Sequence, residues 1–82
     1  MGQYQYREID IDELDLESGI GKVLLDIEQN PGLRSSKGQA LYDNLEWHIQ
    51  LVSARYDHGL VGQNYELTEK GKQVLQQLKD RG

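Results

Sequence analysis

Apolar residues between positions 16 and 29 recur with the period of a helix. They stand three or four residues apart, which places them on one face. Asn30-Pro31-Gly32 follows, and Pro31 ends a helix because it has no N–H to donate and disfavours a helical residue before it. The pattern predicts a helix over 16–29. Its apolar stripe consists of Leu16, Ile20, Val23, Leu24 and Ile27.

Two helix-start signals come next, in close succession. Ser36 with Gln39 is typical of a capping box, and Asp43 with Glu46 repeats the pattern. Because each box marks the first turn of a helix, two boxes this close together predict two helices separated by a turn.

The expected arrangement is a helix over 36–42, a turn, and a second helix over 45–57 that ends at Gly59 in the left-handed conformation. One unbroken helix over 36–57 is the alternative, because an apolar stripe with helical spacing runs through the whole segment. This stripe is expected to face the core. Its members are Leu41, Leu45, Ile49, Val52 and Tyr56.

Two short strands are predicted after these helices. Leu60 and Val61, and then Tyr65 and Leu67, are typical strand residues, and the three residues between them suit a hairpin turn. Tyr65 and Leu67 are two positions apart, so both side chains should lie on one face of the second strand, against the core.

The last element is predicted to be a helix that begins at Thr68. The Thr68 side chain can cap the first turn. Gly71 permits close approach of a neighbouring element. The apolar stripe of this helix consists of Gly71, Val74, Leu75 and Leu78.

The N-terminal segment is harder to assign. Residues 3–11, "QYQYREIDI", are rich in Tyr and Ile with partial alternation, which favours a short strand or an extended arm over a helix. We therefore divide the chain into an acidic arm, 1–15, and a folded domain, 16–82.

Composition limits the class of protein. A chain of 82 residues with 37% hydrophobic and 28% charged residues is expected to form one soluble domain with a small core. It contains no cysteine, and no segment resembles a signal peptide or reaches the roughly 20 apolar residues of a membrane span. A cytoplasmic location is expected.

The formal net charge of -5 is unevenly distributed. Residues 1–29 hold eight acidic side chains against Arg7 and Lys22, a net of -6, whereas residues 30–82 hold seven basic against six acidic side chains, a net of +1. Because the negative charge belongs to the N-terminal third, it does not exclude an anionic partner for the remainder.

The stretches "LLDIEQNPGL" (24–33) and "HGLVGQNYELTEKG" (58–71), and the distance between them, carry a family resemblance. The chain resembles the winged helix-turn-helix family of DNA-binding regulators. The resemblance implies an α+β, mainly α fold: three helices, a short two-stranded wing and a C-terminal helix, preceded here by the N-terminal strand or arm.

The resemblance also implies double-stranded DNA as the partner, read in the major groove by the third helix, in a small transcriptional regulator. The small number of cations predicts useful affinity only from a homodimer. The N-terminal arm of Tyr and Ile residues is the candidate pairing element, because it could pair with a sheet edge in its own chain or in a second copy. Gln50 is a good adenine reader, and Ser53 suits a base or phosphate contact. The sequence departs from the family because the third helix has few cations. The candidate DNA-binding residues are Arg34, Lys37, Trp47, Gln50, Ser53, Arg55, Gln63 and Asn64.

A protein-interaction module of the same fold, without DNA binding, is the alternative. Its interface would be the acidic N-terminal third, with Trp47 as a further candidate because Trp47 suits either the core or an exposed contact. The two hypotheses stay open at this point, because a fold does not fix a function.

No pattern predicts an enzyme, a cofactor or a metal site. "SGIGKV" lacks the first glycine and the final Ser or Thr of a phosphate-binding loop. His48 and His58 have no carboxylate at zinc-ligand spacing, and the acidic run over 8–17 lacks the glycine of a calcium loop.

Overall fold

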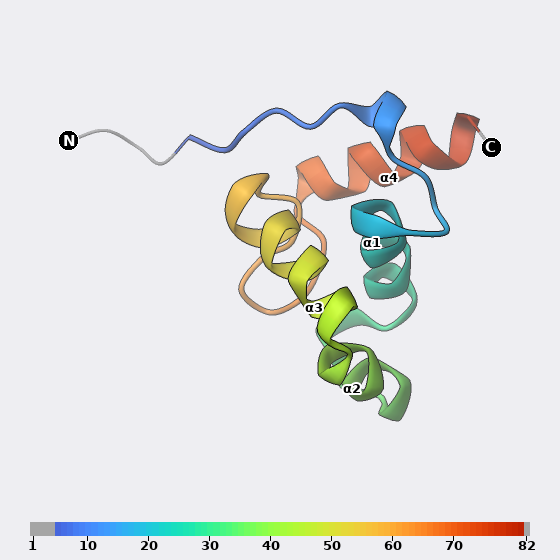
Figure 1. Ribbon diagram of the computed structural model, residues 1–82, viewed down its shortest axis with the longest axis vertical. Helices are drawn as coiled ribbons and strands as arrows, with labels where there is room; N and C mark the ends of the chain where they lie inside the picture. Colours follow the sequence, from blue (N-terminus) through green and yellow to red (C-terminus); the bar gives the residue numbers. More distant parts are fainter. Residues whose placement is uncertain (1–4, 82) are drawn as a thin grey trace.

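The computed structural model describes residues 5–81, which form four α-helices around one apolar core (Figure 1). α1 lies at the centre of the arrangement because it contacts both α3 and α4. A π-helical turn, Ser53–Asp57, continues α3, and 3-10 turns at Ile11–Glu13 and Pro31–Leu33 flank α1. The helices are α1 (Gly19–Gln29), α2 (Ser36–Asp43), α3 (Leu45–Val52) and α4 (Glu69–Arg81).

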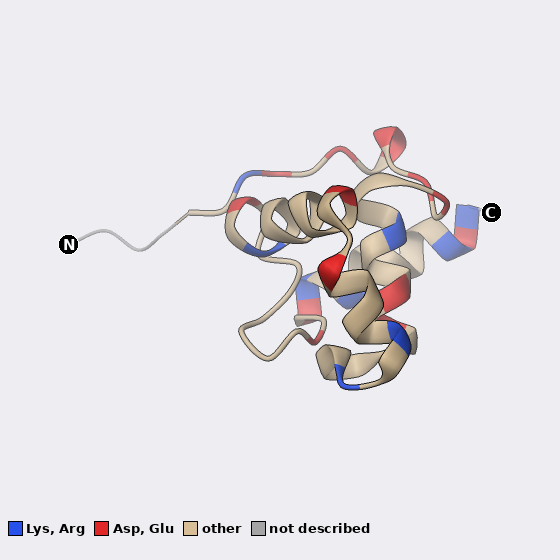
Figure 2. Cartoon of the chain, turned by 60° about the horizontal axis from the view of Figure 1, so that its bottom comes forward, with Lys and Arg blue, Asp and Glu red and all other residues tan. Residues whose placement is uncertain are grey.

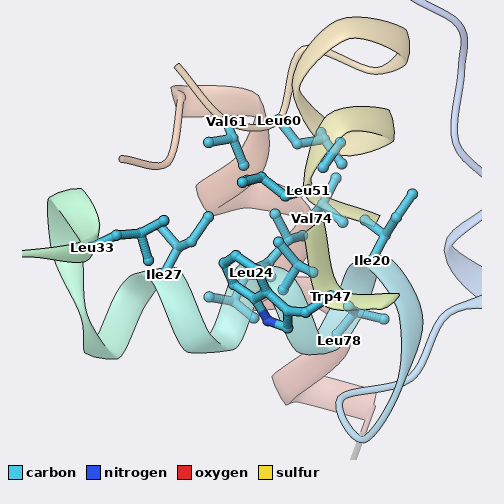
Figure 3. Packing of buried hydrophobic residues seen from close by; sticks show 13 residues of the cluster. Ile20, Leu24, Ile27, Leu33, Trp47, Leu51, Leu60, Val61, Val74 and Leu78 are labelled. Atoms are coloured by element: carbon cyan, nitrogen blue, oxygen red, sulfur yellow. The ribbon is translucent and has the colours of Figure 1, made fainter. Parts of the chain in front are cut away.

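The first predicted helix is present, and its core stripe is confirmed. α1 begins at Gly19, three residues later than predicted, and ends at Gln29, immediately before the Asn30-Pro31 turn. Leu24 is fully buried and lies centrally among the apolar side chains shown in Figure 3. Leu16 precedes the helix and is only partly buried against the core. The buried apolar residues that α1 contributes are Ile20, Val23, Leu24 and Ile27.

The predicted two-stranded wing is wrong. In residues 5–81 there is no β-strand, and the segment between α3 and α4 is a loop with one antiparallel bridge, between Val61 and Leu67. Tyr65 has a φ of 58°, so the chain turns there instead of continuing as a strand, and its N–H donates to the Gly62 carbonyl oxygen at 3.1 Å. The winged helix-turn-helix, α+β fold class is therefore replaced by a mostly helical domain.

The junction of this loop with α4 follows the prediction. Thr68 Oγ1 accepts a hydrogen bond from the Gly71 N–H at 3.0 Å and donates one to the Gly59 carbonyl oxygen at 2.7 Å. Gly59 has a φ of 65°, the left-handed conformation expected there. A Cβ atom on Gly71 would lie 2.0 Å from the Leu60 carbonyl oxygen, so α4 packs on the loop at a distance that only glycine permits. The whole predicted stripe of α4 is buried.

The N-terminal arm lies along its own chain. The short strand or extended arm predicted over 3–11 begins outside the described residues; residues 5–10 form no strand, and Ile11–Glu13 forms a 3-10 turn. The Arg7 N–H donates to the Asp57 carbonyl oxygen at 2.7 Å, and Arg81 of α4 lies 3.7 Å from the Asp12 carboxylate. Figure 1 shows the arm crossing above α4. The described part of the arm, residues 5–15, is thus packed against the helical domain.

Candidate functional site

The segment 36–57 forms two helices, as predicted. α2 ends at Asp43, and Asn44 begins α3 by accepting a hydrogen bond from the Trp47 N–H at 3.1 Å. Ser35 caps α2 in the same way, through the Gly38 N–H at 2.9 Å. Both caps stand one residue away from the predicted ones. The turn fixes the direction of α3 relative to α2, and therefore which side of α3 meets the core.

The predicted orientation of α3 is wrong. The residues expected in the core are exposed: the exposed fractions are 73% for Leu45, 55% for Ile49, 41% for Val52 and 55% for Tyr56. The buried side of α3 and its π turn consists instead of Trp47, Leu51 and Ala54. α3 is turned over relative to the prediction, so its outer face is aliphatic and aromatic.

A hydrogen bond between α3 and α1 explains this orientation. Asp26 of α1 is only 6% exposed, and its Oδ2 accepts from Trp47 Nε1 at 2.9 Å and from Lys22 Nζ at 2.6 Å. A buried carboxylate without partners would be strongly unfavourable. The Trp47 indole both fills the core and supplies a donor to Asp26, which none of the aliphatic side chains on the opposite face can do.

The exposed apolar residues form one continuous surface. We call Leu45, Ile49, Val52 and Tyr56 the α3 patch. The only other large apolar residue exposed in residues 5–81 is Tyr6, at 49%. Its ring packs on Gly59 of the loop, and it lines with Tyr56 an open hollow of about 530 Å³. Scattered exposed apolar residues are ordinary, but a concentration on one face is typical of an interaction site.

Arg55 is engaged within the chain. Its guanidinium carbon lies 4.8 Å from the centre of the Tyr65 ring and 5.1 Å from that of Tyr56, and Nη2 donates to the Gln63 carbonyl oxygen at 3.3 Å. These contacts hold the loop against the end of α3. Arg55, a predicted DNA contact, therefore also stabilises the packing of the loop on the end of α3.

Arg55, Tyr56 and Tyr65 form a side-chain cluster, and further aromatic contacts extend it towards α2. The Tyr42 ring meets the Tyr65 ring edge to face at 5.7 Å and the His48 ring at 4.7 Å. A hydrogen bond with the Tyr65 side chain raises the pKa of the Tyr42 hydroxyl above its usual value. The cluster ties α2, α3 and the loop into one unit beside the α3 patch.

The other predicted DNA-binding residues are not collected on one surface of α3. Arg34 is exposed and lies 3.9 Å from Glu66, and Lys37 is exposed at the start of α2. Gln50 and Ser53 are half-buried on α3, and the Ser53 hydroxyl donates to the Asp57 carboxylate. Gln63 and Asn64 are exposed at the tip of the loop, and Trp47 lies in the core.

Few charges surround the α3 patch. No Lys or Arg occurs between positions 41 and 54, whereas Asp43 and Glu46 lie exposed near Leu45. In Figure 2 the ribbon of this region is largely tan. Arg34 and Lys37 lie at the other end of α2, just before the helix and in its first turn. Phosphate contacts require cations beside the reading surface. The segment Leu45–Val52 contains none, and the Arg55 guanidinium at the Tyr56 end is held by the Tyr65 ring and the Gln63 carbonyl oxygen.

Other chemistry is not supported by the geometry. Among the described residues, no three His, Cys, Asp or Glu side chains are grouped so that they could hold a metal ion. None of the helices in residues 5–81 combines the length and apolar character needed to cross a membrane. Comparison of the chain with protein-family models, with curated proteins and with solved structures gives no match.

Sequence reasoning missed the α3 patch, although a signal was present. Apolar residues occur on both sides of α3, each with helical spacing, so the helix carries more apolar surface than one contact with the core can use. A helix of this kind is either buried all round or has a second interface. Within residues 5–81 no further layer covers this side of α3.

Proposed function

We propose that the protein is a small interaction module that docks another polypeptide on the α3 patch. The single observation that supports this proposal is that all five large apolar residues exposed in residues 5–81 lie on α3 and its π turn or directly beside them. Burial of such a surface is the main favourable term in most protein association. Protein interaction was the alternative drawn from the sequence, but with the acidic N-terminal third as the interface.

The shape of the surface defines the ligand. Leu45, Ile49, Val52 and Tyr56 follow one another at intervals of four, three and four residues, which makes a narrow ridge about 17 Å long at 1.5 Å per residue. A ridge of this width fits one apolar face of another helix, because the side chains of that helix can pack between those of the ridge. We therefore expect a helical partner segment rather than a flat surface or an extended peptide.

Substitution of Ile49 by lysine tests the docking surface. Ile49→Lys is expected to abolish partner binding while it changes the free energy of unfolding by less than about 0.5 kcal/mol, because the side chain is exposed. Gln73→Lys on the outer face of α4 adds the same charge to an exposed site and is the matched control.

Site-specific photocrosslinking provides the measurement. A photoreactive residue placed at position 49 should yield a crosslinked polypeptide, whereas the same residue at position 73 should not. Ile49→Lys and Gln73→Lys chains then compete as unlabelled proteins, and only Gln73→Lys should suppress the crosslink. Equal labelling at both positions would contradict a dedicated docking surface on α3.

Duplex DNA is the second candidate ligand. The observation in its favour is that Arg34 and Lys37 are both exposed close to the first turn of α2, within a two-helix unit of defined geometry. These cations would contact phosphates, and Gln63 and Asn64 at the loop tip would lie nearest a groove. The aliphatic face of α3 makes this candidate weaker than docking of a polypeptide. The cytoplasmic location expected from the sequence stays a prediction.

The salt dependence of DNA binding separates the two candidates. The plot of log K against log salt concentration has a negative slope, and each phosphate contact adds about 0.9 to its steepness. If duplex DNA binds, replacement of both Arg34 and Lys37 by alanine should therefore make this slope less steep by about 2. Lys72→Ala, on an exposed side chain 3.6 Å from Glu69, is the control. The absence of any anisotropy change with fluorescent duplex at low salt would remove the DNA candidate.

A further inference from the structure

We infer that the polypeptide docked on the α3 patch is a second copy of the same chain, with the two α3 helices side by side and antiparallel. This inference rests on the proposed function, because it names the occupant of that surface. It differs from the pairing through the N-terminal arm that the sequence suggested, since the described part of the arm packs on its own chain.

The spacing of the patch is complementary to itself. Intervals of four, three and four residues are those of the apolar seam in a two-stranded coiled coil. If a twofold axis crosses α3 between Ile49 and Val52, Ile49 meets the partner subunit's Val52 and Leu45 meets the partner subunit's Tyr56. Each apolar residue of the patch then has an apolar counterpart. Each of these two contacts occurs twice, once on either side of the axis, as in most symmetric dimers.

The charges at the two ends of the patch favour the antiparallel orientation. Asp43 and Glu46 lie near Leu45, and Lys22, which lines a hollow with Glu17 and Glu46, is already ion-paired with Asp26. The Tyr56 end holds Arg55 and, through the backbone contact of Arg7 with Asp57, the start of the arm.

The acids of that second end, Glu8 and Asp57, balance its two arginines, so it is neutral overall. A parallel pair would bring the acidic ends of both copies together. An antiparallel pair separates them and sets each beside the arginines of the other copy. In the antiparallel pair the dipoles of the two α3 helices also point in opposite directions, which is favourable.

The size of the surface predicts a weak, rapidly exchanging dimer. One face of α3 and its π turn, about 17 Å long on a helix about 10–12 Å wide, falls at the low end of specific interfaces, below about 1,200 Å² in total. Self-association is therefore expected to be measurable in the range from about 10 µM to about 500 µM rather than at nanomolar concentrations.

Analytical ultracentrifugation tests the dimer. The weight-average mass of the full chain should rise from 9.4 kDa towards twice that value over this concentration range, and the rise should be lost in Ile49→Lys but kept in Gln73→Lys. A wild-type chain that stays at 9.4 kDa throughout would overturn the inference, as would an equal rise in both variants. Neither of these two results would contradict a crosslink between position 49 and a different protein, so the crosslinking experiment tests the proposed function separately.

Disulfide trapping tests the orientation, because the described chain has no cysteine of its own. A mixture of Leu45→Cys and Tyr56→Cys chains should form a mixed disulfide dimer under mild oxidation. Leu45→Cys alone should form little dimer, since the two copies of position 45 lie at opposite ends of the interface. Efficient dimer formation by Leu45→Cys alone, with no mixed disulfide between Leu45→Cys and Tyr56→Cys chains in the mixture, would overturn the antiparallel arrangement.

Discussion

Leu51→Ala is expected to lower the free energy of unfolding by about 2–5 kcal/mol, the range for removal of a fully buried leucine side chain. Leu51 is 1% exposed and stands on the side of α3 that faces α1 and α4. The substitution removes packed methyl groups and leaves a cavity that neighbouring side chains fill only in part. Urea unfolding monitored by the fluorescence of Trp47, the single tryptophan, provides the measurement.

Leu45→Ala is the matched control for this prediction. It makes the same substitution on the same helix at a residue that is 73% exposed. We expect a change of less than about 0.5 kcal/mol, because alanine is an even better helix former than leucine and no packed contact is lost. If Leu45→Ala were the more destabilising of the two, α3 would have the orientation that the sequence alone suggested.

Gly71→Ala is expected to lower the free energy of unfolding by about 2 kcal/mol or more through overpacking. The added Cβ would lie 2.0 Å from the carbonyl oxygen of Leu60, and backbone on both sides leaves no flexible side chain to move away. The effect should appear even though alanine is about 1 kcal/mol better than glycine inside a helix. Thermal and urea unfolding of the variant provide the measurement.

Gly62→Ala distinguishes this close approach from a general effect of glycine removal. A Cβ on Gly62 would have its nearest neighbour, the Glu66 carbonyl oxygen, at 3.6 Å, which is ordinary van der Waals contact. The expected change in stability is within about 0.5 kcal/mol. Similar losses in both variants would mean that α4 does not pack on Leu60 at the distance described.

The α3 patch changes the interpretation of the DNA-binding residues. When Leu45, Ile49 and Val52 were expected inside, the outer face of α3 was polar and suited a groove. With the helix turned over, the outer face offers base edges few donors and acceptors and offers phosphates no cation of its own. The same two-helix unit is therefore better suited to apolar association, and its symmetric spacing is the basis on which we propose self-association.

Local rules predicted the elements whose causes lie within a few residues. Pro31 ends α1, Thr68 caps α4, and Gly59 ends the segment after α3 because each effect depends only on the backbone nearby. The separation of α2 from α3 was predictable for the same reason, since a capping side chain contacts N–H groups two or three residues away.

The hairpin failed because the loop is fixed from outside itself. The Gly32 N–H, from the turn after α1, donates to the Tyr65 carbonyl oxygen at 3.0 Å. With Tyr65 held there in the left-handed conformation, the pairing is limited to the Val61–Leu67 bridge, whose hydrogen bonds run from the Thr68 N–H to the Leu60 carbonyl oxygen at 3.1 Å and from the Gly62 N–H to the Glu66 carbonyl oxygen at 2.8 Å. The residues themselves have strand propensity, and the contact of Tyr65 with the turn after α1 overrules it.

The sequence by itself determined the order of the helices, the turns that separate them, which faces of α1 and α4 are buried, and where glycine is required, because each of these follows from local geometry or from a single apolar stripe. It did not determine which of the two apolar sides of α3 faces inward, since both have the spacing of a helix. The tertiary structure decided that question through Asp26, whose buried carboxylate accepts a hydrogen bond from the indole of Trp47, 21 residues away. The candidate docking surface is the side of α3 that this contact leaves exposed.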